Sequence, residues 1–255
     1  MSGFVFWKMD LGVAGGPRGT GAQAPPGPAR AKIGSFPGTA VAVCLLAAGL
    51  LSLTRLEAQD SRALAIMEEA GARYRSVEAF CATFDQTLEV PLLGETHHSR
   101  GELCQAQPDL FAMRWSDPQG DLVVADGEFF WVYYPSADPG QVIQFSMEFR
   151  PGGFDFQREF LEAPGEKYHL SYVGEESVGG RVAYVITAKP KEPAAFNEAR
   201  LWVDRERSLI IQARIGMENG SVRTVALSDF RLEPAPDPDR FRFTPPPGAQ
   251  VIRRD

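Results

Sequence analysis

Residues 98–135 read HSRGELCQAQPDLFAMRWSDPQGDLVVADGEFFWVYYP and carry most of the information about the fold. Apolar and aromatic side chains recur along short runs, which is the pattern of half-buried strands. Asp117-Pro118 and Asp126-Gly127 are typical of the turns between such strands. The segment therefore predicts an antiparallel meander with a large apolar face. That face is either a packed core or a container for apolar ligands.

The same pattern continues on both sides of this segment. Leu64, Met67 and Tyr74 recur at helical spacing and predict an amphipathic helix over 61–76. Phe156, Phe160 and Leu161 predict a second, short helix over 154–163. The βαβ alternation of a parallel sheet is absent from the sequence. Strands are expected over 77–88, 98–106, 110–116, 122–125, 128–134, 141–147, 167–173, 182–189, 198–204, 209–215, 221–230 and 240–244.

The expected fold class is mainly β (α+β). We predict an unclosed antiparallel β-barrel, or half-barrel, of about 10–11 strands, in which a helical lid covers one face of a curved sheet.

The N-terminal part of the chain is not domain-like. Residues 1–38 are rich in Gly, Pro and Ala, and we expect them to be disordered or to be an extension from a wrongly assigned start codon. Residues 39–58 are predicted to be a signal peptide, with an uncharged apolar run at 40–53 and cleavage after Ala58. An uncleaved anchor is the alternative. The domain proper then covers residues 59–255, and the expected location is the periplasm.

The chain is acidic, with 26 basic and 33 acidic residues and a net charge of −7. This balance opposes general binding to nucleic acids and to anionic membrane surfaces. Cys81 and Cys104 fall on consecutive predicted strands, nearly opposite each other across the turn at 91–95. They form either a cross-strand disulfide or two half-buried thiols.

Catalytic and metal sites are not expected. Two cysteines without neighbouring histidine ligands do not complete a zinc shell. His97 and His98 have no matched acid or third ligand and are interpreted as a surface pair. Phosphate-cradling glycine loops and Ser-His-Asp order are also missing. The sequence therefore predicts a protein without cofactors and without enzymatic activity.

Six motifs, in order and with matching spacing from about residue 61 to 252, carry a family resemblance. The chain resembles the LolA family of periplasmic carriers, which ferry lipoproteins to the outer membrane. The motifs are Phe80-x-x-x-Phe84-x-Gln86, Gly101-Glu102-Leu103, Pro108-Asp109-Leu110-Phe111, Val123-Val124-Ala125-Asp126-Gly127, Trp131-Val132-Tyr133-x-Pro135 and Phe241-x-Phe243-Thr244-Pro245-Pro246-x-Gly248.

The resemblance implies a hydrophobic cavity that takes the acyl chains of a lipoprotein, with a partly vacant interior and a movable cover. Implied partners are an inner-membrane ABC lipoprotein transporter and an outer-membrane receptor, acting on a monomer without nucleic acid. The implied lining is Phe80, Phe84, Leu103, Phe111, Met113, Trp115, Leu122 and Val124, with Phe154, Phe156, Phe160 and Leu161 on the lid.

One position departs from the family pattern. Members of the family carry an arginine before the Pro of the third strand, where it holds the lid shut, and here this position is Gln107. A neutral amide can bond lid carbonyls only without charge assistance. Gln107 is therefore expected to control the lid more weakly, or Arg100 or Arg114 takes over this role.

Alternative functions use the same scaffold. The first is a lipid or envelope-stress sensor that regulates a membrane partner, although such proteins usually append a second domain. The second is an acylated outer-membrane receptor, which the absence of a lipobox around Cys44 opposes. The third, an enzyme, lacks a supporting motif.

Overall fold

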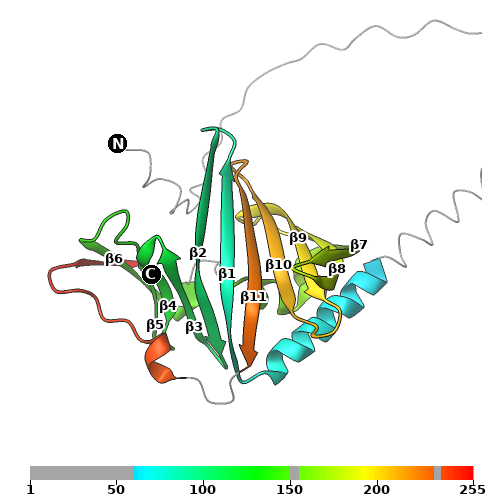
Figure 1. The fold of residues 1–255 in the computed structure, drawn as a ribbon, viewed down its shortest axis with the longest axis horizontal. Coiled ribbons are helices and arrows are strands. Elements are labelled where there is room, and N and C mark those ends of the chain that lie inside the picture. The colour runs from blue at the N-terminus through cyan, green and yellow to red at the C-terminus, as the bar shows by residue number, and fades with distance from the viewer. Residues whose placement is uncertain (1–59, 150–154, 233–236, 255) are drawn as a thin grey trace, which may run out of the picture.

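The computed structural model describes residues 60–149, 155–232 and 237–254. Within these ranges, strands of one continuous sheet dominate, and the α-helices lie on one side of it (Figure 1). The predicted half-barrel fold is confirmed, with twelve strands in place of ten to eleven. The expected extension over 1–38 and the expected signal peptide over 39–58 lie outside the described residues.

The strands follow one another as hairpins along the chain. Their order across the sheet is β12-β6-β5-β4-β3-β2-β1-β11-β10-β9-β8-β7. Their bounds are β1 Ala79–Val90, β2 Glu95–Ala106, β3 Leu110–Asp117, β4 Gln119–Ala125, β5 Phe129–Tyr133, β6 Gln141–Ser146, β7 Tyr168–Val178, β8 Arg181–Pro190, β9 Phe196–Asp204, β10 Ile210–Met217, β11 Val222–Leu232 and β12 Gln250–Arg254.

Strand β1 lies at the centre of the sheet and joins two meanders. It pairs with β2 on one side, with Phe84 opposite Gly101, and with β11 on the other, with Phe84 opposite Leu227. One meander runs from β1 to β6, and the other returns from β7 to β11. The central position of β1 therefore brings residues from both halves of the chain onto one face.

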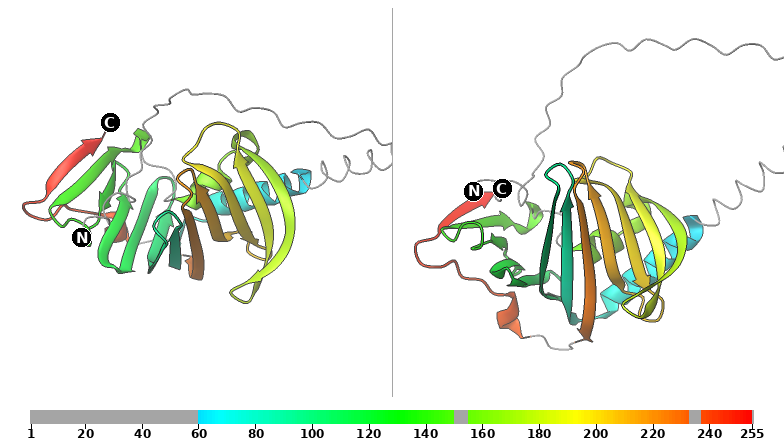
Figure 2. Two further views of the ribbon diagram at one scale, coloured as in Figure 1. Left: turned by 90° about the horizontal axis from the view of Figure 1, so that it is seen from above. Right: turned by 45° about the horizontal axis from the view of Figure 1, so that its top comes forward.

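The sheet bends so that its two wings curve back toward each other (Figure 2). The predicted helix at 61–76 is confirmed as a helix over 60–76, which lies on the concave side, beside the wing formed by β7 to β10. Ala63, Met67 and Ala70 on this helix are fully buried against the sheet. The amphipathic spacing thus places the apolar stripe of the helix on the concave face.

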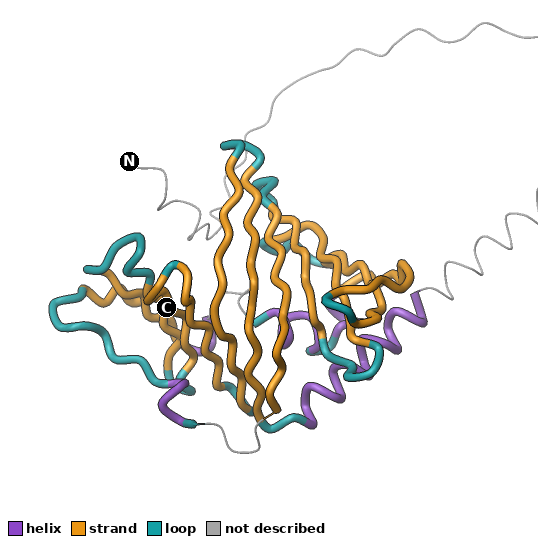
Figure 3. The backbone as a smooth tube through the Cα atoms, viewed as in Figure 1, coloured by secondary structure: helices purple, strands orange, loops and turns teal. Residues whose placement is uncertain are grey.

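The second predicted helix is shorter than expected. Helix α2 covers Phe156–Leu161, and α3 covers Pro164–Lys167 (Figure 3). Between them Ala163 adopts a positive φ of 49°. Pro164 disfavours the α conformation in the residue before it, so one continuous helix cannot form.

The predicted strand at 240–244 is wrong. The chain forms a short 3-10 helix, η3, at Pro238–Phe241, and residues 242–246 are extended without a strand partner. Prolines 245–247 lack the N–H groups that a ladder needs. The last strand is β12, which pairs in parallel with β6. A short 3-10 helix, η2, at Met147–Phe149 follows β6.

Candidate functional site

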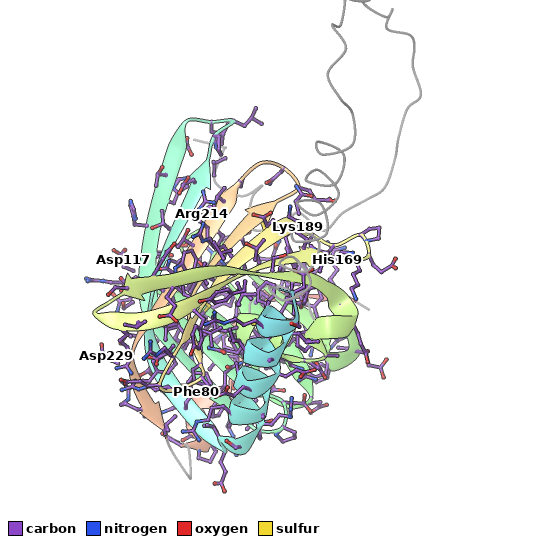
Figure 4. All side chains as sticks on the ribbon, turned by 90° about the vertical axis from the view of Figure 1, so that its right-hand side faces the viewer. Phe80, Asp117, His169, Lys189, Arg214 and Asp229 are labelled. Atoms are coloured by element: carbon purple, nitrogen blue, oxygen red, sulfur yellow. A yellow bond between two sulfur atoms is a disulfide. The ribbon has the colours of Figure 1, made fainter. Side chains whose placement is uncertain are left out.

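The concave face of the sheet carries a continuous apolar surface, which we call the concave apolar face. Phe80 and Phe84 on β1 lie at its centre, Leu103 and Met113 extend it over β2 and β3, and Leu227 extends it over β11. Directly opposed residues of paired strands point to the same side of a sheet, and this register joins them. Figure 4 shows side chains occupying the space around Phe80, between the sheet and the helices.

Aromatic rings pack edge to face along this surface. Phe84 and Trp115 have ring centroids 5.3 Å apart, and Trp115 and Tyr134 have centroids 5.7 Å apart. Gly101 makes room for this arrangement, because a Cβ there would lie 2.8 Å from a ring atom of Phe84 and 2.0 Å from the carbonyl oxygen of Arg114. The glycine of the Gly-Glu-Leu motif thus serves packing on the concave apolar face.

Most of the predicted lining lies together on this face. The side chains of six predicted residues are buried in one cluster with the helix over 60–76. That these residues contact acyl chains stays a prediction. The six are Phe80, Phe84, Leu103, Phe111, Met113 and Trp115.

Two predicted lining residues, Leu122 and Val124, are misplaced. They belong to a separate cluster on the opposite face, with Cys81 and Cys104. The register pairs Met113 with Val123 and Phe111 with Ala125, so Val123 and Ala125 are the β4 residues on the concave side. The run Leu122–Ala125 is apolar throughout, which hides its alternation in the sequence.

Two of the predicted lid residues lie on α2, and that α2 acts as a movable lid stays a prediction. Phe160 and Leu161 on α2 are buried in the same cluster as the concave apolar face. The ring of Phe160 lies 5.5 Å from those of Tyr168 and Phe196. Phe154 lies outside the described residues, and Phe156 begins α2 but its side chain is not described. Helix α2 therefore covers the face directly, at least through its last turn.

Helix α2 is held at both sides. The side-chain amide of Gln157 donates to the carbonyl oxygen of Ile210 on β10 at 2.8 Å. Arg158 forms an ion pair with Asp109, in the turn between β2 and β3, with an N–O distance of 2.5 Å. The two contacts reach opposite halves of the sheet, so α2 bridges the concave apolar face.

The hydroxyl of Tyr168 fastens the end of α2. It donates to a carboxylate oxygen of Glu159 at 2.5 Å. Burial and this carboxylate together raise the pKa of Tyr168 well above its usual range. The hydroxyl therefore stays protonated and remains a donor at ordinary pH.

Gln107 does not make the contact predicted for it. Its side-chain amide donates to the carbonyl oxygen of Tyr74 at 3.4 Å, near the end of the helix over 60–76. Arg114 points to the opposite face. Instead, the ion pair of Arg158 with Asp109 joins α2 to the turn between β2 and β3. Sequence spacing could not find this pair, because 49 residues separate the partners.

One end of the concave apolar face is polar. The hydroxyl of Ser99 accepts bonds from Gln86 at 3.2 Å and from the indole N–H of Trp115 at 3.3 Å. Gln86 in turn accepts from Arg223 at 2.8 Å. Burial lowers the pKa of the Arg223 guanidinium and raises that of the nearby Tyr134 hydroxyl. Side chains at this end of the face can thus make hydrogen bonds to polar groups, whereas the apolar side chains of the rest of the face cannot.

A C-terminal segment over residues 238–249, which we call the strap, covers the opposite face. Phe243 lies against Tyr133 and Trp131, with ring centroids 5.5 and 5.8 Å apart. Arg114 donates to the carbonyl oxygens of Arg240 and Arg242 at 3.1 and 2.9 Å. The strap therefore closes this face and leads the chain to β12.

The predicted pairing of Cys81 with Cys104 is confirmed. The two residues are directly opposite in the β1–β2 register and form a disulfide on the face beneath the strap. Glu102 lies close to both sulfur atoms, but it forms an ion pair with Arg231. Because both sulfurs are bonded to each other, this cluster does not offer thiolate ligands to a metal.

The sequence profile described as "Outer membrane lipoprotein carrier protein LolA" matches residues 75–157. A second profile, described only as an uncharacterized protein, matches residues 120–232. An outer-membrane lipoprotein carrier protein of Halorhodospira halophila is 28% identical over 218 residues, which cover 84% of this chain and 95% of that protein. Over the matched residues the chain is similar to the LolA family.

Two solved structures are among those similar to this chain. A LolA superfamily protein of Nitrosomonas europaea has 17% identity and a TM-score of 0.39, and the match covers 71% of this chain and 97% of that one. A MucA/MucB complex of Pseudomonas aeruginosa has 19% identity and a TM-score of 0.41, covering 72% of this chain and 63% of that one.

The LolA-like carriers that this chain resembles are a binding and chaperone family. In this chain His97 lies 3.0 Å from the carboxylate of Glu95, and His98 lies 3.2 Å from the hydroxyl of Thr87. Both contacts are on the exposed outer part of the β1–β2 hairpin. Within the described ranges, none of the helices is long and apolar enough to cross a bilayer.

Proposed function

We propose that this protein binds the acyl chains of lipoproteins on its concave apolar face and carries them through the periplasm to the outer membrane. One observation carries the proposal. A broad surface of aromatic rings and methionine is covered by a six-residue helix, which a partly exposed ion pair fastens on one side. The relationship to outer-membrane lipoprotein carriers supports the same role.

The chemistry of the face suits reversible binding of hydrocarbon. Moving an acyl chain out of water is worth about 0.8 kcal/mol for each buried CH₂ group. Phe84, Trp115 and Met113 offer broad apolar contact without demanding one geometry, so different chains can bind. Binding involves no covalent step and needs no cofactor. Specificity for the cargo then comes from the transporter that supplies it.

Entry of acyl chains requires α2 to move. Phe160 and Leu161 lie directly on the concave apolar face, so they occupy the place that a chain would take. The helix over 60–76 is anchored along a longer buried stripe and stays in place. Opening therefore means that α2 loses its contacts to Asp109 and Ile210 while the sheet remains intact.

A fluorescent fatty-acid probe tests the proposal. The exported protein should bind the probe, and Phe111→Glu should abolish binding. Phe111→Ala and Phe241→Ala form a matched pair, because both rings are 2% exposed and lie on opposite faces. Each should cost about 3–5 kcal/mol of stability. Only Phe111→Ala should weaken binding of the probe, and equal binding by folded variants of both kinds would refute the proposal.

Cargo and partners are tested in the cell envelope. Protein purified from envelope extracts should co-elute with lipoproteins, and crosslinking should recover an inner-membrane ABC transporter and an outer-membrane receptor. Recovery of a single membrane regulator without lipoproteins would instead favour the role of an envelope sensor. N-terminal sequencing of the same material establishes whether cleavage follows Ala58.

A further inference from the structure

The hairpin of β1 and β2 extends beyond the rest of the sheet (Figures 1 and 3). Strand β3 pairs with β2 only up to Arg100, and β11 pairs with β1 only up to Glu89. Residues Glu95 to Ser99 therefore pair with β1 alone. At the rise of a strand, this length projects by roughly 16 Å past β3.

Two leucines form the tip of this hairpin. Leu92 is 88% exposed and Leu93 is 56% exposed, in the turn over residues 91–94. The turn is ordered by bonds from the amides of Leu93 and Gly94 to the carbonyl oxygens of Val90 and Pro91, at 3.0 and 3.2 Å. A rigid turn thus holds two large apolar side chains in water, at a cost that folding alone does not explain.

We propose that this tip, defined as residues 91–94, inserts into the surface of a lipid bilayer and docks the protein on the membrane. The inference rests on the proposed function, because a carrier of acyl chains must reach a membrane to load or release them. The tip lies at the polar end of the concave apolar face, since Leu88 pairs with Arg223. Docking through the tip would therefore turn that end of the face toward the bilayer.

Size argues for a bilayer as the occupant. A specific protein interface buries about 800 Å² on each partner, which two leucines on a narrow turn cannot supply. The groups next to the tip are polar or charged, including Glu89, Glu95 and His97. Insertion into the interfacial region needs only about 5–10 Å of apolar depth, and the turn over residues 91–94 lies beyond the last pairs that β3 and β11 make with the hairpin.

The charge around the tip determines which kind of lipid bilayer it should prefer. Glu89 and Glu95 flank the tip, and the whole chain has a net charge of −7. Anionic lipids would repel this surface, so binding must come from apolar insertion. The tip is therefore expected to prefer zwitterionic phosphatidylcholine vesicles over vesicles that contain an anionic lipid.

Vesicle flotation tests the inference, using exported protein recovered from a bacterial periplasmic extract. Protein-free phosphatidylcholine vesicles should bind the wild type, and Leu92→Ser/Leu93→Ser should lower the partition coefficient by about tenfold or more. Val173→Ser/Val182→Ser is the matched control, because these valines are 52% and 48% exposed on β7 and β8. The control should bind vesicles as the wild type does.

The outcomes separate this inference from the proposed function. The tip variant should keep its affinity for the fatty-acid probe, because both leucines are exposed in the turn and are not part of the concave apolar face. Equal vesicle binding by wild type and tip variant, or absence of binding by the wild type, overturns membrane docking. A tip variant that changes only self-association or capture of a protein also overturns it. A wild type that binds vesicles but does not bind the fatty-acid probe would refute the carrier role and leave the docking inference standing.

Discussion

Arg158 on α2 and Asp109 in the turn between β2 and β3 form an ion pair that joins this helix to the sheet. The nitrogen–oxygen distance is 2.5 Å, and the two side chains are 30% and 43% exposed. The hydrogen bond to Asp109 and the surrounding carboxylates raise the pKa of Arg158 despite its partial burial. The contact joins the lid to the sheet where water can reach it. Such a contact can be broken without unfolding the protein.

Breaking this ion pair should speed the release of ligand at a small cost in stability. Partly exposed pairs contribute about 0–1 kcal/mol, so Arg158→Ala should lower the free energy of unfolding by no more than that. If the closed position of α2 loses the same free energy, the dissociation rate of a bound fatty-acid probe should rise by up to about fivefold. Stopped-flow fluorescence measures the rate, and the exchanged pair Arg158→Asp/Asp109→Arg should recover it. An unchanged rate in Arg158→Ala would show that the pair does not hold the lid.

Asp204 should make the stability of the protein depend on pH in acid. Burial alone would raise the pKa of Asp204, but Arg181 and the backbone amides of Glu206 and Arg207 outweigh it and hold the pKa below its usual range. A lowered pKa gives stability that is complete above the unfolded pKa of about 3.9 and is lost as the pH falls through the folded value.

The substitution Asp204→Asn should therefore cost about 2 kcal/mol at pH 7, from the loss of hydrogen bonds to a charged group. This deficit should stay constant down to about pH 5 and shrink as the pH falls below about 4. Urea unfolding at pH 7, 5 and 3.5 measures it. Asp85→Asn, on an exposed part of β1, is the control and should change little. Equal stability of Asp204→Asn and wild type at pH 7 would contradict the assignment.

The disulfide should stabilise the fold without affecting the binding face. Cys81 and Cys104 are separated by 23 residues, and closing a loop of this length is worth about 3 kcal/mol in the chain-entropy account. Cys81→Ser/Cys104→Ser should lower the urea midpoint accordingly. Affinity for the fatty-acid probe should persist, because the bond lies under the strap. A large loss of probe affinity in the folded variant would mean that the two faces are coupled.

Phe243 should hold the strap against the sheet. Its ring contacts Tyr133 and Trp131, and each aromatic pair contributes about 0.5–1.5 kcal/mol beyond the buried area. Phe243→Ala should therefore expose the strap to limited proteolysis and lower stability by about 1–3 kcal/mol. Phe243→Leu, which keeps an apolar side chain, should be less sensitive to the protease. Identical digestion of Phe243→Ala and wild type would show that other contacts hold the strap.

The sequence alone determined the strand-rich fold and the first helix, and it left a disulfide between Cys81 and Cys104 as one of two alternatives. Alternation at Phe80 and Phe84, and turn residues such as Asp126-Gly127, are local signals, because side chains in a strand point to opposite faces with a period of two. The same signals placed Phe111, Met113 and Trp115 on one face. They failed at Leu122 and Val124, because a run that is apolar on both sides shows no period.

Only the tertiary structure decided how helix α2 is held and where the C-terminal segment lies on the sheet. Arg158 meets Asp109, and β12 joins β6, through contacts that span many residues of sequence and depend on the curvature of the whole sheet. The position of the strap also depends on the assembled sheet, because its apolar side chains pack on a surface that β3 to β5 form together. A local pattern reports the direction of a side chain relative to its own strand. Which residue this side chain contacts depends on how strands that are distant in the sequence are brought together, and a local pattern carries no information about that.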